Sequence, residues 1–147
     1  MTAAVDAIAL NEALRRACQR LSSAEEVVLQ EAGLTWHHHA ALRVLMDCYP
    51  NALTVMEVAR RVSSLHINIT PMLDFLATQG LIDRKRLEQN RRKVMVTITQ
   101  SGLDLLESIS PRIRKWLEEA IAFLPDEEQQ DLLRLVSKFN DHPVNVV

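Results

Sequence analysis

A cluster of basic side chains carries the clearest chemistry in this sequence. Six of the 17 Lys and Arg residues lie between Arg84 and Lys93. The segment 54–93 has eight basic and four acidic residues, a charge of +4 in a chain whose net charge is −2. A compact cationic segment on an otherwise acidic body is typical of proteins that bind a polyanion. The alternative is that Arg84, Lys85 and Arg86 only solubilise an exposed edge strand.

The basic cluster is predicted to lie on a β-hairpin. Leu81-Ile82 opens one strand, and apolar and polar residues alternate over 93–99, which is the period of a second strand. The polar segment 87–90 suits the tip between them. Arg91 and Arg92 are therefore expected at or beside the tip.

Two short helices are predicted before the hairpin. Thr54 and Glu57 have the S/T-x-x-E spacing of a capping box, so the first helix should start at Thr54, and Ser63-Ser64 favours a turn after it. Apolar residues at helical spacing predict the second helix from about His66 to Gln79.

Gly80 and Pro71 affect the end and the shape of the second predicted helix. Gly80 stands where a left-handed residue ends a helix, and Pro71 is expected to kink the first two turns. With the apolar stripe turned inward, some side chains must face a bound partner. These are Ile67, Asn68, Pro71, Asp74 and Phe75, with His66 and Thr70 at the edge.

Short motifs in a fixed order carry a family resemblance. They are Gly33-Leu34-Thr35, Leu42-Arg43-Val44-Leu45, Leu53-Thr54, Val58-Ala59-Arg60-Arg61-Val62, Leu76, Gly80-Leu81-Ile82-Asp83-Arg84, Asn90-Arg91-Arg92, Val96-Thr97-Ile98-Thr99 and Gly102. A helix, a turn, a helix and a hairpin in this order resemble the winged helix-turn-helix of the MarR family of bacterial transcription regulators. The resemblance extends from about Leu10 to Phe139. It departs at Asn90, where the family usually has an aspartate, and in a recognition helix with few polar or basic residues.

The resemblance implies a mainly helical fold of about six helices plus a β-hairpin wing. It also implies one domain over 1–147, with a winged DNA-binding lobe at 35–99. The helices at 5–31 and 100–140 would form the interface of a dimer.

The terminal segments are themselves predicted to be helical. One long helix is expected over 5–31, another from a Thr99 cap to about Leu124 with a bend at Ser110-Pro111, and a last one starting at Pro125. Their apolar residues exceed what the winged lobe can cover. A second subunit would cover them, and the alternative is a monomer whose two ends pack on each other.

The function implied by the resemblance is a DNA-binding transcriptional regulator. It would be a repressor that binds a pseudo-palindromic operator as a homodimer and is relieved by a small aromatic or anionic effector. The expected partners are therefore double-stranded DNA, a second copy of the chain and that effector. The expected DNA-binding residues are Ser64, His66, Ile67, Asn68, Thr70, Pro71, Arg84, Lys85, Arg86, Asn90, Arg91 and Arg92. The sparse polar surface of the recognition helix favours an alternative, a winged protein-interaction module without DNA binding.

A histidine run supplies candidate effector residues. Trp36, His38 and His39, with Cys18 on the first helix, are placed where similar family members hold phenolic or carboxylate ligands. Consecutive helical residues fan out by about 100°, so the three histidines of the run cannot converge on one ion, and no metal site is expected. Packed or solvated histidines are the alternative.

Cys18 also suggests a thiol-based peroxide sensor of the same fold. The organic-hydroperoxide-sensing branch of the family uses a cysteine on the first helix, and it shares Thr70-Pro71 and an aromatic residue after Thr35. The alternative is a buried and unreactive thiol.

The composition argues against several other classes of protein. At 147 residues and 48% hydrophobic, the chain suits one domain with an adequate core. Charged residues near the N-terminus and the lack of a long uncharged apolar run predict a cytoplasmic protein without a membrane span. The two cysteines do not have metal-cluster spacing, and only three glycines occur, none in a phosphate-binding loop. No enzyme activity and no cofactor are expected.

Overall fold

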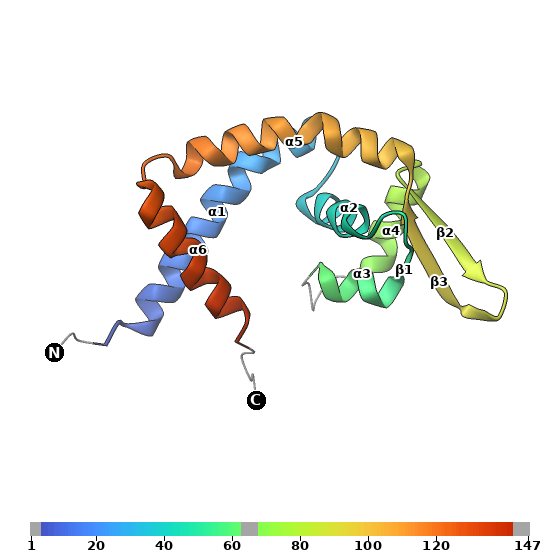
Figure 1. Cartoon of the computed structure of the whole chain (residues 1–147), viewed down its shortest axis with the longest axis horizontal. Coiled ribbons are helices and arrows are strands. Elements are labelled where there is room, and N and C mark those ends of the chain that lie inside the picture. The colour runs from blue at the N-terminus through green and yellow to red at the C-terminus, as the bar shows by residue number, and fades with distance from the viewer. Residues whose placement is uncertain (1–3, 63–67, 143–147) are drawn as a thin grey trace.

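The computed structural model describes residues 4–62 and 68–142. Within these ranges the chain forms six helices and a three-stranded antiparallel sheet, so the predicted fold class is confirmed. In Figure 1 the long helix α5 spans the molecule, with the winged lobe below one end and α1 and α6 below the other. The helices are α1 (Ala7–Glu31), α2 (Trp36–Cys48), α3 (Val55–Arg61), α4 (Ile69–Thr78), α5 (Gln100–Ile121) and α6 (Asp126–Asn140). The strands are β1 (Leu53–Thr54), β2 (Ile82–Leu87) and β3 (Asn90–Ile98).

One hydrophobic core joins α2, α3, α4 and the sheet to α5. Leu42 of α2 and Leu73 of α4 are fully buried, as are Val96 of β3 and Leu106 of α5. The core also takes in the last turn of α1, where Val28 and its neighbour Leu29 are buried. The winged lobe is therefore held directly against the C-terminal end of α1 and the N-terminal part of α5.

The start of α3 confirms the predicted capping box. Thr54 Oγ1 accepts the N–H of Glu57 at 3.2 Å, and the N–H of Thr54 donates to Glu57 Oε2 at 2.7 Å. These hydrogen bonds lower the pKa of Glu57. Their contribution to stability is thus present above the ordinary pKa near 4.5 and is lost as the pH falls through the lowered value.

Replacing Thr54 with alanine is expected to lower the free energy of unfolding by about 1 kcal/mol, because the N–H of Glu57 loses the hydroxyl oxygen that caps it. Urea denaturation would measure the change. Thr54→Ser keeps the hydroxyl and is the matched control. Equal losses in the two variants would argue against the cap.

The second helix is shorter than predicted. α4 begins at Ile69 rather than at His66, because Asn68 has extended backbone angles and caps the helix by accepting the N–H of Thr70 at 3.3 Å. Pro71 then lies in the first turn, where its missing N–H would have had no helical partner. The prediction that Pro71 kinks the interior of this helix is therefore wrong, because Pro71 lies in the first turn. The segment 63–67, with the predicted Ser63-Ser64 turn, lies outside the described residues.

The wing forms as expected but with different limits. Gly80 has φ +71° and ends α4. β3 starts at Asn90, so the tip is Glu88-Gln89 rather than all of 87–90. The two-residue β1 was not predicted, because its strand geometry depends on pairing with Val96 and Met95 of β3 rather than on its own sequence.

The terminal helices are continuous. α1 is one helix with Asp6 as its N-cap, and α5 is capped by Thr99 and passes Pro111 without interruption along a curved path (Figure 1). No residue of α6 is buried within the described chain. The alternative of a monomer whose two ends pack on each other therefore does not hold for α6, whose apolar side chains stay uncovered. None of the described helices has the length and apolar character needed to cross a membrane.

Candidate nucleic-acid interface

The N-terminal part of α4 presents an exposed surface. Thr70, Pro71 and Asp74 are exposed, as predicted, while Met72 and Leu73 face the core. Asn68 is also exposed, but its side-chain oxygen is occupied by the cap, which leaves its NH₂ group for an outside partner. Three predicted DNA-binding residues, Ser64, His66 and Ile67, lie outside the described ranges.

Phe75 does not face outward as predicted. It is partly buried against the core, and its ring stacks on that of His38 with centroids 4.4 Å apart and an interplanar angle of 16°. Helical periodicity could not predict this contact, because it shows which side of α4 faces the core but not which other helix packs beside α4. α2 supplies a second neighbour that covers Phe75 from the flank.

An ion pair connects α4 to the base of the wing. Arg84 Nη1 of β2 lies 2.6 Å from Asp74 Oδ1, and both side chains are partly exposed. Such a surface pair contributes little to stability, on the order of 0 to 1 kcal/mol. The ion pair matters more for the surface charge, because Arg84 neutralises the Asp74 carboxylate on the outer face of α4.

The distal half of the wing is exposed to solvent. Lys85, Arg86, Arg91 and Arg92 all lie there. Asn90 Oδ1 accepts the N–H of Arg92 at 3.2 Å. The Asn90 amide thus makes the hydrogen bond that an aspartate could make at this position, and it adds no negative charge to the wing. Because successive strand residues point to opposite faces, the two adjacent arginines place one guanidinium on each side of the hairpin.

The four predicted effector residues do not come together. Cys18 is exposed on α1, and Trp36 is half-exposed beside a cavity of about 280 Å³ that it shares with α1. His38 faces α4, whereas His39 is only 8% exposed and lines a different cavity, of about 240 Å³, between α2 and α5. The histidine run therefore serves two separate places.

The cavity beside His39 has the chemistry of an anion site. The side chains around it include Arg43 of α2 and Arg114 and Glu118 of α5. His39 Nε2 is buried and has no hydrogen-bond partner among the described residues. Burial lowers the pKa of His39, and the charge of Arg43 lowers it further, so the ring is neutral at pH 7 and can donate or accept one hydrogen bond.

Arg43 and Arg114 were not among the predicted effector residues. The i, i+4 spacing of His39 and Arg43 does put them on one helical face. Arg114 is 71 positions further along the chain than Arg43, and only the packing of α5 on α2 brings it to the same cavity.

Two consecutive short helices, the second with an exposed N-terminal face, and the cationic β-hairpin that follows them define the chain as a winged helix-turn-helix protein. No protein-family model matches the sequence. The transcriptional repressor YetL of Bacillus subtilis is 28% identical over 116 residues, which cover 74% of this chain and 70% of YetL. A MarR transcription factor from Planctomyces limnophilus superimposes with a TM-score of 0.73 at 27% identity, covering 92% of this chain and 98% of that one. The fold of BpsR from Bordetella bronchiseptica matches with a TM-score of 0.81 at 23% identity over 89% of this chain and 98% of BpsR.

The chain therefore has the fold of MarR-family regulators and is similar to them in sequence, in line with the resemblance of its motifs. Its relatives are transcription regulators of the helix-turn-helix type.

Proposed function

We propose that the protein is a DNA-binding transcriptional repressor that acts as a homodimer on a pseudo-palindromic operator. The observation that carries this proposal is the wing, which bears exposed arginines and lies beside α4 (Figure 1). YetL, one of its relatives, is itself a repressor. In this arrangement α4 enters the major groove and the wing contacts the adjacent backbone or minor groove.

The wing suits a groove because it is basic on both faces. The minor groove is bounded by two phosphate backbones, and a hairpin inserted between them would direct Arg91 to one and Arg92 to the other. Lys85 and Arg86 on β2 would add phosphate contacts. On α4, Thr70, Pro71 and the NH₂ group of Asn68 are the described groups available to base edges.

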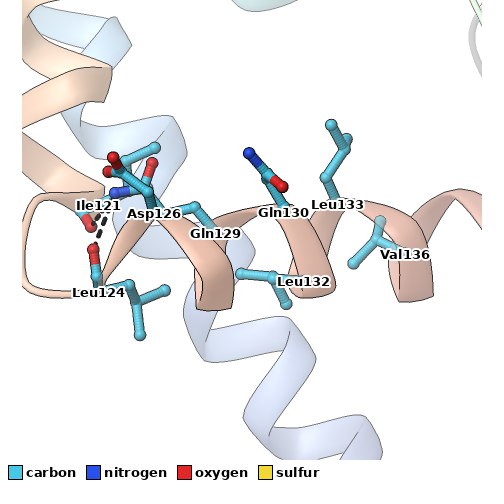
Figure 2. Close-up of a pocket in the computed structure, with 8 residues that line it drawn as sticks. All are labelled: Ile121, Leu124, Asp126, Gln129, Gln130, Leu132, Leu133 and Val136. Carbon is cyan, nitrogen blue, oxygen red and sulfur yellow. Dashed lines mark hydrogen bonds between the residues drawn. The ribbon is translucent and has the colours of Figure 1, made fainter.

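Exposed apolar side chains support the dimer. Along α6, Leu133 is 68% exposed and Phe139 is 60% exposed, and Phe123 before this helix is 73% exposed. Figure 2 shows Leu132, Leu133 and Val136 along α6 beside an apolar groove of about 530 Å³ at the α5–α6 corner. A monomer rarely leaves so continuous an apolar surface in water, and a second copy would bury it.

An electrophoretic shift series with the DNA upstream of the protein's own operon tests the DNA-binding proposal. Retardation of this DNA at lower protein concentration than unrelated DNA is expected. Failure to retard either DNA at low salt would instead favour a winged protein-interaction module.

We further propose that the cavity beside His39 binds a small aromatic carboxylate that releases the DNA. Arg43 and Arg114 would pair with the carboxylate, and His39 Nε2 would find its hydrogen-bond partner on the ligand. BpsR offers a parallel, since its DNA binding is regulated by 6-hydroxynicotinic acid. The cavity adjoins α5, the helix that carries the wing at its start, so a ligand there can act on the spacing of the two reading helices.

Replacing His39 with leucine is expected to abolish the ligand response and to stabilise the free protein. Leucine fills a similar volume and removes a buried nitrogen that lacks a partner, which should raise the free energy of unfolding by about 1 kcal/mol. Benzoate and 4-hydroxybenzoate are suitable probes. In a thermal-shift titration they should raise the Tm of the wild type but not that of His39→Leu.

The matched control is His37→Leu, because His37 lies edge-on to Trp36 and does not line the cavity. It should keep the ligand response. An unchanged response in His39→Leu would exclude this cavity as the effector site.

The thiol-sensor alternative has a weaker basis in the structure. Cys18 is exposed on α1, and Cys48 at the end of α2 accepts a hydrogen bond from Arg61 Nη1 at 2.9 Å. The two sulfur atoms thus belong to different parts of the chain. Cys18→Ser, tested for loss of a peroxide effect on DNA binding, would decide this alternative.

A further inference from the structure

His38 makes contacts that join two different elements. Its Nδ1 accepts the N–H of Thr35 at 3.1 Å, and its own backbone N–H donates to Thr35 Oγ1 at 3.3 Å. The face of the same ring stacks on Phe75 of α4. The imidazole therefore lies between the N-terminus of α2 and the helix proposed to read DNA.

The hydrogen bond from Thr35 fixes the protonation state of His38. A nitrogen that accepts an N–H must offer a lone pair, so Nδ1 is unprotonated and the neutral ring carries its proton on Nε2. In the imidazolium form both nitrogens are donors, and Nδ1–H would point at the N–H of Thr35. A cation is still attracted to the face of Phe75, so protonation removes the bond that orients the ring rather than the attraction of the stack.

We propose that His38 is a positioning residue for the recognition helix: its ring, oriented by Thr35, fixes Phe75 and hence α4, and a proton on His38 loosens this contact and weakens DNA binding. The inference rests on the proposed function and adds a residue that touches no DNA. Phe75 is suited to transmit the contact because it is packed against the core between Met72 and Leu76 of α4.

The surrounding groups set the pH range. Burial is the main cause that lowers the pKa of His38 below its ordinary 6.5, and the charge of His37 lowers it further. On α4 the titratable group next in sequence to the stacked ring is Asp74, which is already paired with Arg84 of β2. The other titratable neighbour on α2 is His39, which faces the cavity on the α5 side. DNA affinity should therefore be constant above the ordinary pKa and fall as the pH drops through the lowered value.

Fluorescence anisotropy with the upstream DNA, at constant ionic strength from about pH 8 to about pH 5.5, tests the proposal. The variants are His38→Gln and, as matched control, His37→Gln. Glutamine at position 38 can accept the N–H of Thr35 at every pH but has no ring to stack. His38→Gln should bind a few-fold more weakly than the wild type at pH 8 and keep that affinity at pH 5.5.

The wild type and His37→Gln should both lose affinity several-fold over the same range. Parallel pH profiles for the wild type and His38→Gln would overturn the proposal. A wild type that binds no DNA at pH 8 would instead count against the proposed function.

An NMR titration of the free protein tests the inference without DNA. The Thr35 amide, the His38 ring and the Phe75 ring should change with one common midpoint below 6.5. A Phe75 ring whose signals stay constant while His38 titrates would overturn the coupling to α4.

Discussion

Replacing Arg91 and Arg92 together with alanine is expected to weaken binding to every duplex tested and to flatten its dependence on salt. Each phosphate contact releases condensed counterions and contributes about 0.9 to the slope of log affinity against log salt concentration. A dimer carries two wings, so up to four contacts are lost and the slope should fall by up to about 3.6. Affinity at low salt should drop by about two orders of magnitude or more.

The loss should be nearly the same for operator and unrelated DNA, because phosphate contacts position a protein without reading sequence. Titrations at several salt concentrations measure both quantities. The matched control is Arg15→Ala with Arg16→Ala, an adjacent exposed pair on α1 that changes the net charge equally. An unchanged slope in the wing variant would remove the hairpin from the mechanism, and a flattened slope in the control would point to a general charge effect.

The second large effect is expected at the junction between the wing and α5. Gly102 is buried in the first turn of this helix, and a Cβ there would meet the backbone oxygen of Leu81 and, at 2.6 Å, Cγ1 of Ile98. Alanine is a better helix former than glycine by about 1 kcal/mol, so propensity alone predicts that Gly102→Ala stabilises. The steric term has the opposite sign and is larger, because a backbone oxygen cannot rotate away as a flexible side chain would.

Gly102→Ala is therefore expected to lower the free energy of unfolding by about 2 kcal/mol, within the range for overpacked cores. Urea denaturation and the Tm measure the loss. Ser101→Ala is the control, since Ser101 is the exposed neighbour in the same turn. A Gly102→Ala variant as stable as the wild type would mean that the junction can open without cost.

This junction also explains how a ligand near α5 could act on the wing. Thr99 Oγ1 donates to the carbonyl oxygen of Gly80 at 2.7 Å, and the N–H of Thr99 donates to that of Leu81 at 3.0 Å. The end of α4, the start of β2 and the start of α5 therefore meet at one point. A movement of α5 would therefore move the wing and α4 together. To switch a dimer nearly completely, a ligand must favour one geometry by about 5.5 kcal/mol.

Acid sensitivity and ligand response would use two different sides of the same helix. His38 and His39 are adjacent on α2, yet one contacts α4 and the other faces α5. The same neutral imidazole chemistry thus serves two different contacts. Measurements of ligand release should be made at a fixed pH, so that protonation of His38 is not mistaken for an effect at His39.

Elements whose signals are local can be predicted from the order of residues alone. Thr54 with Glu57, Thr99 and Gly80 mark helix boundaries because each acts on backbone groups within a few residues. Alternation of apolar residues over 93–99 identified the second strand of the hairpin, Leu81-Ile82 marked the start of the first, and the basic cluster between them identified the wing. These contacts depend on neighbours in the chain, so the order of residues suffices to predict them.

The contacts between side chains that are distant in the sequence depend on how the helices and strands pack together. Phe75 turned inward because α2 packs beside it, β1 became a strand because β3 lies next to it, and Arg114 reached the cavity of His39 because α5 crosses α2. Each of these contacts joins residues more than 35 positions apart, and their approach is set by the packing of whole helices. No local pattern encodes that packing, which is why the histidine run read as one site in the sequence and separates into two in the fold.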